Sequence, residues 1–575
     1  MSDQHSQPYL PRFSDPRDID EFVAKLESFE RGEIGPDAFR AFRLTRGVYG
    51  QRQSDVQMLR VKIPTGIFGK SQLDALADVA DKYSRGFGHF TTRQNMQLHF
   101  VKMSDVEAAM RRCDEAGLTI REACGNSVRN VTMCERASIC SSAPFDVSPF
   151  GEAIVRYFLR HPLAATLPRK FKIAFSGCAD DCAKAAIHDL GFVATVKDGT
   201  PGFKVYAAGG LSTLPMSAIV LHDFVRAEEI ARVGEAILRV FDRLGNRENK
   251  HRARLKYVLK KLGEEGFRAK YQEIVAEVEA EAKAELKLPQ SPERTPAPPV
   301  IIEGAPKPGY LPWRAASVVD QRQDGYAAVY VRLPLGDITS AQMRAFGPIL
   351  EKFGDGSARV TIDQNLLIPF VDKRSLPALH AALDEIDFTK LGVHTARDVT
   401  SCPGAETCNL AVTASRNLGR AITDRLEKLD AIALPGADTA VIKISGCPNS
   451  CGQHHIADLG FHGAARKDGG TGVTVPMYQL HLGGGVDQRG ATFGRQVVKI
   501  VARRVPDAVV KLLQLFGSDR AEGESITAFY QRVDPKRVVA ALGELVSIPA
   551  TAEESADIDE SSGFVVAVGQ GECAA

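Results

Sequence analysis

The feature that most constrains this chain is an internal repeat, because blocks of its first half recur in the second half 268 to 270 positions later. The block HFTTRQNMQLHFV, for example, recurs as RVTIDQNLLIPFV. Four blocks at nearly constant offset indicate an ancient duplication. We therefore expect two homologous half-chains related by a pseudo-twofold axis. The paired positions are Pro64 with Pro334, Gln94 and Asn95 with Gln364 and Asn365, Cys134 and Cys140 with Cys402 and Cys408, and Cys178 and Cys182 with Cys447 and Cys451.

The length and charge of the chain set broad limits on its class. At 575 residues it exceeds the roughly 250 to 300 residues that one hydrophobic core supports, which predicts three to four domains. Its 72 basic and 71 acidic side chains leave a net charge of +1, so no overall field attracts nucleic acid or an anionic membrane. The N-terminus lacks an apolar leader, and no stretch approaches the roughly 18 apolar residues of a spanning helix. These features predict a cytoplasmic protein.

Hydrophobic periodicity near the N-terminus predicts a compact α+β unit. Apolar residues recur at helical spacing from Asp18 to Phe42, and residues 58–66 alternate as a half-buried strand does. A helix over 70–83, a strand over 89–101 and a helix over 105–116 are expected to follow.

A long polar helix and a proline-rich linker are expected between the two halves. Residues 248–288 are rich in Lys, Glu and Ala, and their basic start from Lys250 to Lys261 is interpreted as a solvated helix face rather than a docking patch. Prolines then remove backbone donors and fix backbone angles, which predicts an extended linker. They are Pro289, Pro292, Pro296, Pro298, Pro299, Pro306 and Pro308.

The spacing of the cysteines points to a metal centre. A cytosolic chain with eleven cysteines uses them for metal binding or chemistry more often than for disulfides. The second half carries C-x5-C followed by C-x3-C, and soft thiolates in two pairs suit an iron–sulfur cluster or zinc. Zinc sites usually have cysteines spaced more closely, as C-x2-C to C-x4-C. A set of buried free thiols without a metal is the third alternative. Glycine and proline around these cysteines favour a backbone that wraps closely around a cluster and donates N–H groups to its sulfurs.

At these motifs the chain resembles the siroheme-dependent sulfite and nitrite reductases, from about Arg43 to Leu545. The resemblance implies an oxidoreductase of the α+β class, in which each half contributes a ferredoxin-like half-unit and a siroheme- and iron–sulfur-binding α+β domain. It further implies that four cysteines hold a [4Fe-4S] cluster and that the thiolate of the last one is also the axial ligand of the siroheme iron. These residues are Cys402, Cys408, Cys447 and Cys451.

Domain boundaries follow from the repeat together with the resemblance. We expect an N-terminal arm over 1–50, ferredoxin-like half-units over 51–120 and 313–392, reductase domains over 121–288 and 393–548, the linker over 289–312 and a mobile, acidic tail over 549–575.

Basic residues in the first half match the anion-binding positions of the resembled family. They are Arg93 in TTRQN, Arg129 in SVRNVT, and Lys170 and Lys172 in LPRKFK. Siroheme carries eight carboxylates and the substrate is an anion, so both require cations. The resemblance implies that all four bind substrate oxygens and relay protons, and that Arg93, Arg129 and Lys172 also contact the siroheme.

The expected reaction is the six-electron reduction of sulfite to sulfide, with nitrite to ammonia as the alternative on the same site. Sulfite is favoured because paired lysines suit a dianion. The chain lacks G-x-G-x-x-G after a strand, a flavin motif and a ferredoxin-type cysteine run. Electrons are therefore expected from a separate ferredoxin or flavoprotein. A cluster-only electron-transfer protein and a colourless, zinc-stabilised interaction protein are the rival classes, and an absorption spectrum separates them.

Several other residues of chemical interest remain without a role or with alternatives open. Cys134, Cys140, Cys178 and Cys182 keep the spacing of the second-half set, and leftover buried thiols are favoured over a second cluster, zinc or redox pairing. A second siroheme is not expected, because Asp363 stands where the first half has Arg93 and Val441 where it has Lys172. His454 and His455 are interpreted as packed, hydrogen-bonded support. Cys113 and Cys573 are assigned no role.

Overall fold

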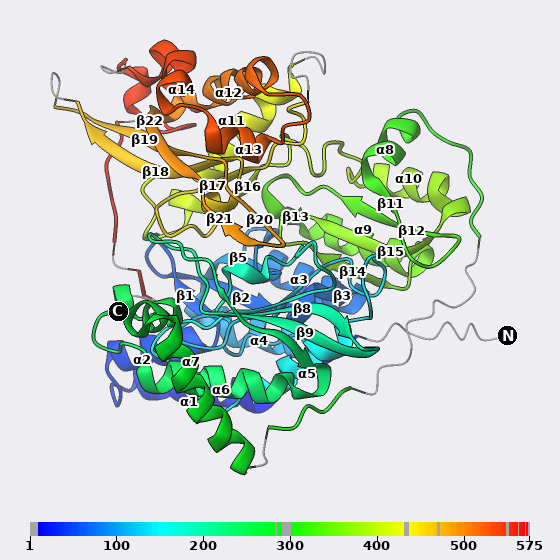
Figure 1. Ribbon diagram of the computed structural model, residues 1–575, viewed down its shortest axis with the longest axis vertical. Coiled ribbons are helices and arrows are strands. Elements are labelled where there is room, and N and C mark those ends of the chain that lie inside the picture. The colour runs from blue at the N-terminus through cyan, green and yellow to red at the C-terminus, as the bar shows by residue number, and fades with distance from the viewer. Residues whose placement is uncertain are drawn as a thin grey trace.

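The computed structural model describes residues 10–281, 284–289, 301–429, 436–468, 472–547, 551–561, 563–569 and 571–572. Figure 1 shows two small helix-and-sheet units and two larger ones, with the chain's first half in blue to green and its second half in green to red. The central part of the expected linker lies outside the described residues. Within the described ranges, no helix is both long and apolar enough to cross a membrane.

The first small unit alternates helices and strands as the hydrophobic periodicity predicts. The helix expected over 70–83 has these bounds, and the preceding strand occupies 56–62. The elements are α1 (Pro16–Glu30), α2 (Pro36–Thr45), β1 (Val48–Gly50), β2 (Val56–Lys62), β3 (Ile67–Gly69), α3 (Lys70–Tyr83), β4 (Phe87–Phe90), β5 (Asn95–Lys102) and α4 (Val106–Glu115).

Two expectations for this unit need correction. The helical pattern from Asp18 to Phe42 forms two helices, because the chain turns at Gly32, whose φ of +75° is in the left-handed region. The strand expected over 89–101 is a hairpin of β4 and β5. Residues 91–94 make its turn, and the N–H of Gln94 donates to the carbonyl oxygen of Thr91 at 2.9 Å.

The second small unit repeats the first. Both long helices begin alike, because Gln72 and Gln342, one in each unit, accept a hydrogen bond from the backbone N–H that precedes the helix. The elements are α8 (Tyr310–Ser317), β11 (Val318–Asp320), β12 (Tyr326–Val331), β13 (Asp337–Thr339), α9 (Ser340–Phe353), β14 (Ser357–Val360), β15 (Leu366–Asp372) and α10 (Leu376–Asp384).

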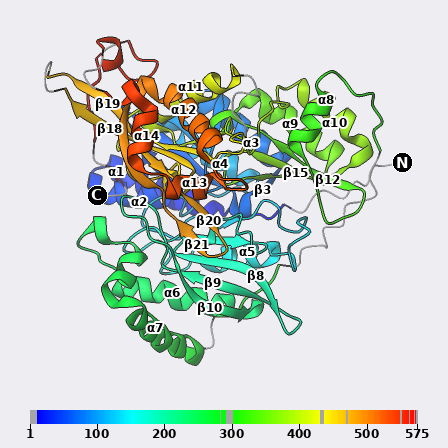
Figure 2. The same ribbon diagram turned by 45° about the horizontal axis from the view of Figure 1, so that its top comes forward.

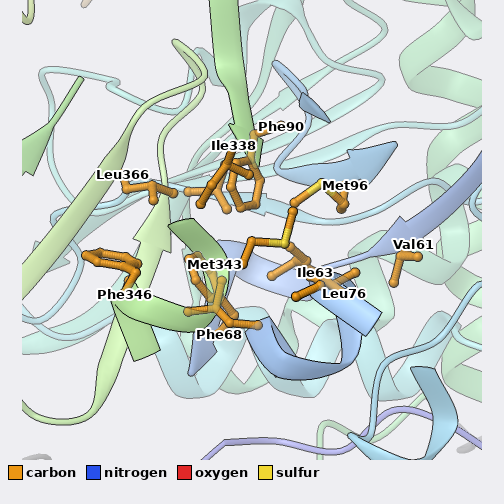
Figure 3. Packing of buried hydrophobic residues seen from close by; sticks show 14 of the residues in the cluster. Val61, Ile63, Phe68, Leu76, Phe90, Met96, Ile338, Met343, Phe346 and Leu366 are labelled. Carbon is orange, nitrogen blue, oxygen red and sulfur yellow. The ribbon is translucent and has the colours of Figure 1, made fainter. Parts of the chain in front are cut away.

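Each small sheet takes its last strand from the other half of the chain. The first sheet has the order β1-β2-β5-β4-β13 and the second β11-β12-β15-β14-β3, and both exchanged strands pair antiparallel. Figure 1 shows β3 beside β14. One hydrophobic core therefore serves both units, and in Figure 3 Phe68, Phe90 and Met96 of the first half surround Ile338 and Met343 of the second. The duplication and its two-fold character are confirmed by this reciprocal exchange.

A pair of buried glutamines joins the halves reciprocally. Nε2 of Gln94 donates to the carbonyl oxygen of Val360 at 2.7 Å, and Nε2 of Gln364 donates to that of Phe90 at 2.9 Å. Both glutamines have positive φ. Gly66 has φ +79°, and a Cβ there would lie 2.7 Å from Nε2 of Gln94. Glycine is thus required where the backbone passes the glutamine.

The two larger units share one sheet topology, with orders β10-β9-β8-β7-β6 and β16-β17-β18-β19-β22. In each, three parallel strands continue into an antiparallel pair. Figure 2 shows α7 below β9 and β10, and buried residues of α6 and α7 share one hydrophobic core with β9. The first has β6 (Thr132–Met133), α5 (Ser148–Phe158), β7 (Ile173–Ser176), β8 (Leu190–Lys197), β9 (Thr200–Ala207), β10 (Ile219–Arg226), α6 (Ile230–Leu244) and α7 (Leu255–Glu281). The second has β16 (Thr400–Ser401), α11 (Ser415–Glu427), β17 (Ile442–Ser445), β18 (Leu459–Lys467), β19 (Thr474–Leu482), the hairpin β20 (Gly485–Asp487) and β21 (Gly490–Thr492), β22 (Arg495–Val501), α12 (Val505–Asp519), α13 (Ile526–Arg532) and α14 (Pro535–Leu542).

The C-terminal segment, expected to be mobile, instead makes specific contacts at its described residues. Asp557 is buried and accepts a hydrogen bond from the N–H of Ala414 at 2.8 Å. Glu572 forms an ion pair with Arg43 and accepts from the N–H of Gly50 at 2.6 Å. The acidic residues of this segment therefore pair with basic side chains and backbone N–H groups of the rest of the protein, whereas the sequence suggested that solvent surrounds them.

Candidate functional site

The four second-half cysteines converge because of the sheet topology. Cys402 follows β16 and Cys447 follows β17, and these neighbouring strands run parallel, with Ser401 opposite Ile444. Their carboxyl ends therefore meet at one edge of the sheet. Cys408 and Cys451 lie a few residues further along the same two loops.

The backbone approaches these sulfurs closely. The N–H of Gly446 donates to Sγ of Cys402 at 3.2 Å, and Ser415 Oγ lies 3.4 Å from the same sulfur. A Cβ on Gly446 would lie 2.8 Å from the Cα of Gly404, so only glycine fits. The expected N–H donation to a sulfur is present at Cys402.

The thiols are chemically suited to bind a cation. Burial, together with the neighbouring sulfurs of Cys451 and Cys402, raises the pKa of Cys408 to about 12. Burial and Cys451 also raise the pKa of Cys402 and of Cys447. Buried thiols of this kind are stabilised as thiolates by bound metal. This soft, mutually close donor set fits an iron–sulfur cluster.

Two of the four predicted cations, Lys170 and Lys172, lie near Cys451, and Arg129 and Arg93 lie near these lysines. Three loops carry the four residues. Arg93 is in the turn between β4 and β5, Arg129 precedes β6, and Lys170 and Lys172 precede β7. Burial lowers the pKa of Arg93 to about 9 and that of Lys170 to about 8, and the charge of Arg129 contributes to both shifts. Burial and then Arg93 lower the pKa of Lys172. A Cys451 thiolate raises the pKa of both lysines, so sulfur and ammonium groups are neighbours.

Hydrogen bonds hold the arginine side chains in place. Nη1 of Arg93 lies 2.5 Å from Nε2 of His188, and its Nη2 donates to the carbonyl oxygen of Asn130. Nη2 of Arg129 donates to the carbonyl oxygen of Gly125 at 2.7 Å. The neutral partners of Arg93 orient its guanidinium without cancelling its charge, so this positive charge remains available to an anion.

The sequence interpretation missed two buried cations of the same group. Arg254 pairs with the fully buried Asp189 at 2.7 Å, and its charge lowers the pKa of Lys172. Nζ of Lys256 donates to the carbonyl oxygen of Leu211 at 2.6 Å. The basic run that begins at Lys250 was interpreted as a solvated helix face, which is wrong for Arg254 and Lys256. Their partners are at least 42 positions away, so no local pattern indicated this.

The excess of enclosed positive charge tests the fit of a polyanionic cofactor. Asp189 neutralises Arg254 and also accepts from the N–H of Lys172 at 2.9 Å. The pKa values of Arg93, Lys170 and Lys172 are all lowered, and the charge of a neighbouring cation contributes to each shift, so positive charge is concentrated here. A guest with many carboxylates supplies the missing charge, and siroheme is such a guest.

The corresponding place in the other half lacks this excess. Asp363, the counterpart of Arg93, pairs with the ammonium of Lys443 at 2.5 Å. Val441, the counterpart of Lys172, is exposed. A carboxylate in place of a guanidinium makes this region unsuited to a second polyanion.

The first-half cysteines pack as two pairs. Cys134 packs with Cys182, and its thiol donates to Cys182, which lowers the pKa of Cys182. Cys140 packs with Cys178, and Ser142 Oγ lies 3.2 Å from Sγ of Cys140 and 3.7 Å from Sγ of Cys178. This arrangement leaves the earlier alternatives open.

His454 and His455 are both buried, as the support role requires, but they differ in hydrogen bonding. Nε2 of His455 lies 2.9 Å from the carbonyl oxygen of Ser212. Among the residues that the structure describes, neither ring nitrogen of His454 has a partner. The hydrogen-bonded support expected for His454 is therefore not found.

The duplicated fold, the cysteine quartet and the cations beside it define an iron–sulfur oxidoreductase that handles anions. Two family models match the chain: "Nitrite and sulphite reductase 4Fe-4S domain" over residues 124–278 and 392–548, and "Nitrite/Sulfite reductase ferredoxin-like half domain" over 49–116 and 319–386. The chain belongs to the nitrite and sulphite reductase family. It is an oxidoreductase of the kind that uses siroheme and a [4Fe-4S] cluster.

Similar proteins include both named activities of this family. The chain is 28% identical over 485 residues to "Sulfite reductase [ferredoxin] 1" of Mycolicibacterium paratuberculosis, covering 84% of this chain and 83% of that protein. It is 30% identical over 479 residues to "Ferredoxin--nitrite reductase" of Synechococcus elongatus, covering 80% and 86%. The solved structure of the Mycobacterium tuberculosis NirA protein matches with a TM-score of 0.75 at 27% identity, covering 93% of this chain and 98% of that one.

Proposed function

We propose that this protein reduces sulfite to sulfide with six electrons, and that Cys402, Cys408, Cys447 and Cys451 hold the [4Fe-4S] cluster. In this proposal the Cys451 thiolate is shared with the siroheme iron. The observation that carries it is the proximity of Lys170 and Lys172, from the first half, to the fourth cysteine of the second half. When bound, the cofactor pair supplies electrons to a substrate on the iron.

The cations have two tasks in this proposal. Arg93 and Arg129 bind the substrate oxygens through their guanidinium groups, which their neutral hydrogen-bond partners keep oriented. Lys170 and Lys172 stabilise negative charge as oxygen leaves and donate protons, directly or through water, to the departing oxygen atoms. Arg93, Arg129 and Lys172 also neutralise carboxylates of the siroheme.

Nitrite is the second candidate substrate, and the relatives divide between the two activities. Sulfite is placed first because two ammonium groups on one segment suit a dianion better than the monoanion nitrite. The measurement that decides is kcat/KM for each anion with the same chemical reductant. A higher value for nitrite would overturn the assignment of sulfite.

Ferredoxin is the proposed electron donor, supported by the word ferredoxin in the names of relatives of both kinds. The alternative donor is a flavoprotein reductase. Turnover supported by reduced ferredoxin at a rate near that with a chemical reductant is the expected result. Turnover with a flavoprotein reductase but not with ferredoxin would contradict it.

A further inference from the structure

Four histidines that the proposed reaction does not use form one buried group, the histidine cluster. His454 and His455 lie on the short 3-10 helix η10 (His454–Ile456), His462 on β18 and His481 on β19. The ring centroids of His454 and His455 are 4.1 Å apart, and those of His454 and His481 are 4.8 Å apart. All four side chains are buried. The four imidazoles therefore form one continuous buried group.

The hydrogen bonds inside the cluster leave ring nitrogens without partners. Nε2 of His455 lies 2.9 Å from the carbonyl oxygen of Ser212, and Nδ1 of His462 lies 2.8 Å from Nε2 of His481. In the described part of the chain, neither ring nitrogen of His454 has a partner. Buried polar atoms without a partner are costly, which indicates that something else satisfies them.

The duplication provides an internal control for the role of these residues. The counterparts of His454, His455 and His462 at an offset of 269 are Ala185, Ala186 and Val193. His481 stands opposite Gly460 in the β18–β19 pair, as Tyr206 stands opposite Gly191 in the β8–β9 pair. Those four first-half residues pack together as one apolar cluster. The fold therefore does not require histidine at these positions.

We propose that His454, His455 and His481 bind a divalent cation of the zinc class, with His462 orienting His481. One ligand nitrogen from each of the three lies within 4.8 Å of the other two. Two ligands of one tetrahedral zinc ion lie about 3.4 Å apart, since the Zn–N bond is about 2.1 Å. Side-chain rotations that bring the three nitrogens about 1 Å or slightly more closer together therefore complete the site.

The state of the rings and their outer partners suits this role. Burial lowers the pKa of all four imidazoles, and a metal ligand must be neutral. The Ser212 carbonyl oxygen and His462 each engage Nε2 of a proposed ligand, and such contacts fix ring orientation in metal sites. Neutral nitrogen ligands without a carboxylate favour zinc-class ions over calcium or magnesium.

The first experiment measures zinc uptake by the holoenzyme. Wild type is dialysed against Zn²⁺ buffered by a weak chelator, and zinc is counted per chain. A variant carrying His454→Ala, His455→Ala, His462→Val and His481→Tyr reproduces the first-half set, and His251→Ala changes an exposed histidine as the control. We expect about one zinc per chain in wild type and in the control, and at least a tenfold loss in the quadruple variant. Equal zinc in all three, or none in wild type, would overturn the proposal.

The second experiment needs no variant, in case the quadruple variant loses its iron and folds poorly. X-ray absorption at the zinc edge of loaded wild type should show nitrogen neighbours at about 2.0 Å. Sulfur neighbours at about 2.3 Å would place the zinc on cysteines and refute the histidine site. Zinc uptake is measured without turnover, so its outcome is independent of the proposed reductase activity.

Discussion

Thr92 donates a hydrogen bond from its Oγ1 to the carbonyl oxygen of Cys451 at 3.1 Å, across the boundary between the two halves. The neighbouring residue Arg93 is thereby fixed beside the fourth cysteine of a motif that lies more than 300 positions later in the chain. Neither half alone contains both the cations and the sulfurs of the proposed site. In the proposed site, the first half therefore supplies the anion-binding cations and the second half supplies the cluster ligands.

Replacing Cys451 tests the shared thiolate. Cys451→Ser removes a proposed cluster ligand and the proposed link to the siroheme, so we expect siroheme to be lost or magnetically uncoupled from the cluster. Iron content and electron paramagnetic resonance of the purified variant provide the measurement. Cys573→Ser is the matched control, because the sequence assigns that cysteine no role. Normal cofactor content together with full activity in Cys451→Ser would contradict the assignment.

Removing Arg93 tests the anion-binding role. Arg93→Ala is expected to leave the cofactors largely in place and to raise the activation free energy by about 2 to 4 kcal/mol, as loss of an oxyanion donor does. Activity at saturating substrate, normalised to siroheme content, gives this value. Arg489, an exposed arginine paired with Asp487, is replaced by Ala as the control. An unchanged rate in Arg93→Ala would remove this residue from the site.

Iron analysis decides the state of the first-half cysteines. One cluster with siroheme gives about five irons per chain, and a second cluster raises this to about nine. Cys134 and Cys182 contact each other directly, which suits packed thiols, and we expect about five. A value near nine, accompanied by matching acid-labile sulfide, would establish a cluster on Cys134, Cys140, Cys178 and Cys182.

Gln94 is expected to stabilise the junction between the halves. Gln94→Ala leaves the carbonyl oxygens of Met133 and Val360 without the donor that now serves them, because both accept from Nε2. Buried unpaired groups of this kind cost about 2 kcal/mol or more in the free energy of unfolding. Urea unfolding measures the difference, with Gln272→Ala on the exposed side of α7 as the control. A change no larger than the control would refute the role.

The pair of Asp363 and Lys443 predicts a pH-dependent loss of stability. Burial alone would raise the pKa of Asp363, but the Lys443 ammonium outweighs it and lowers the pKa to about 2. Asp363→Asn should reduce the free energy of unfolding at pH 7 by about 3 kcal/mol, since it leaves a buried ammonium unpaired. Because the pKa of Asp363 is lower in the folded state than in the unfolded state, the ion pair stabilises the folded protein fully at pH values above the unfolded pKa of about 3.9. This stabilisation is lost as the pH falls toward 2.

The corresponding measurement compares wild type and Asp363→Asn by urea unfolding at several pH values. The difference should be constant between pH 7 and 5 and should shrink below about pH 4. Glu265→Gln, at an exposed glutamate of α7, serves as the control. A difference that does not change down to the lowest pH studied would show that the ion pair is not its source.

The sequence alone determined the features that rest on periodicity and repetition. The offset between Gln94 and Gln364 revealed the duplication, and helical spacing located α3 at its observed bounds. The cysteine spacing indicated the class of metal centre, because ligand type and number are properties of the chain itself. The sequence did not reveal that β4 and β5 are separate strands of a hairpin. The turn from Thr91 to Gln94 depends on a glutamine whose hydrogen-bond partner lies in the other half of the chain.

Only the tertiary structure decided which distant groups meet. The exchange of β3 and β13, the pairing of Arg254 with Asp189, and the contact of Thr92 with Cys451 join residues far apart in the chain. The four histidines also lie on three separate elements, and their adjacency follows from the pairing of β18 with β19. The surroundings of a side chain in the folded protein decide whether it is buried, whether its nitrogens have partners and whether its charge is compensated. A pattern along the sequence does not contain this information.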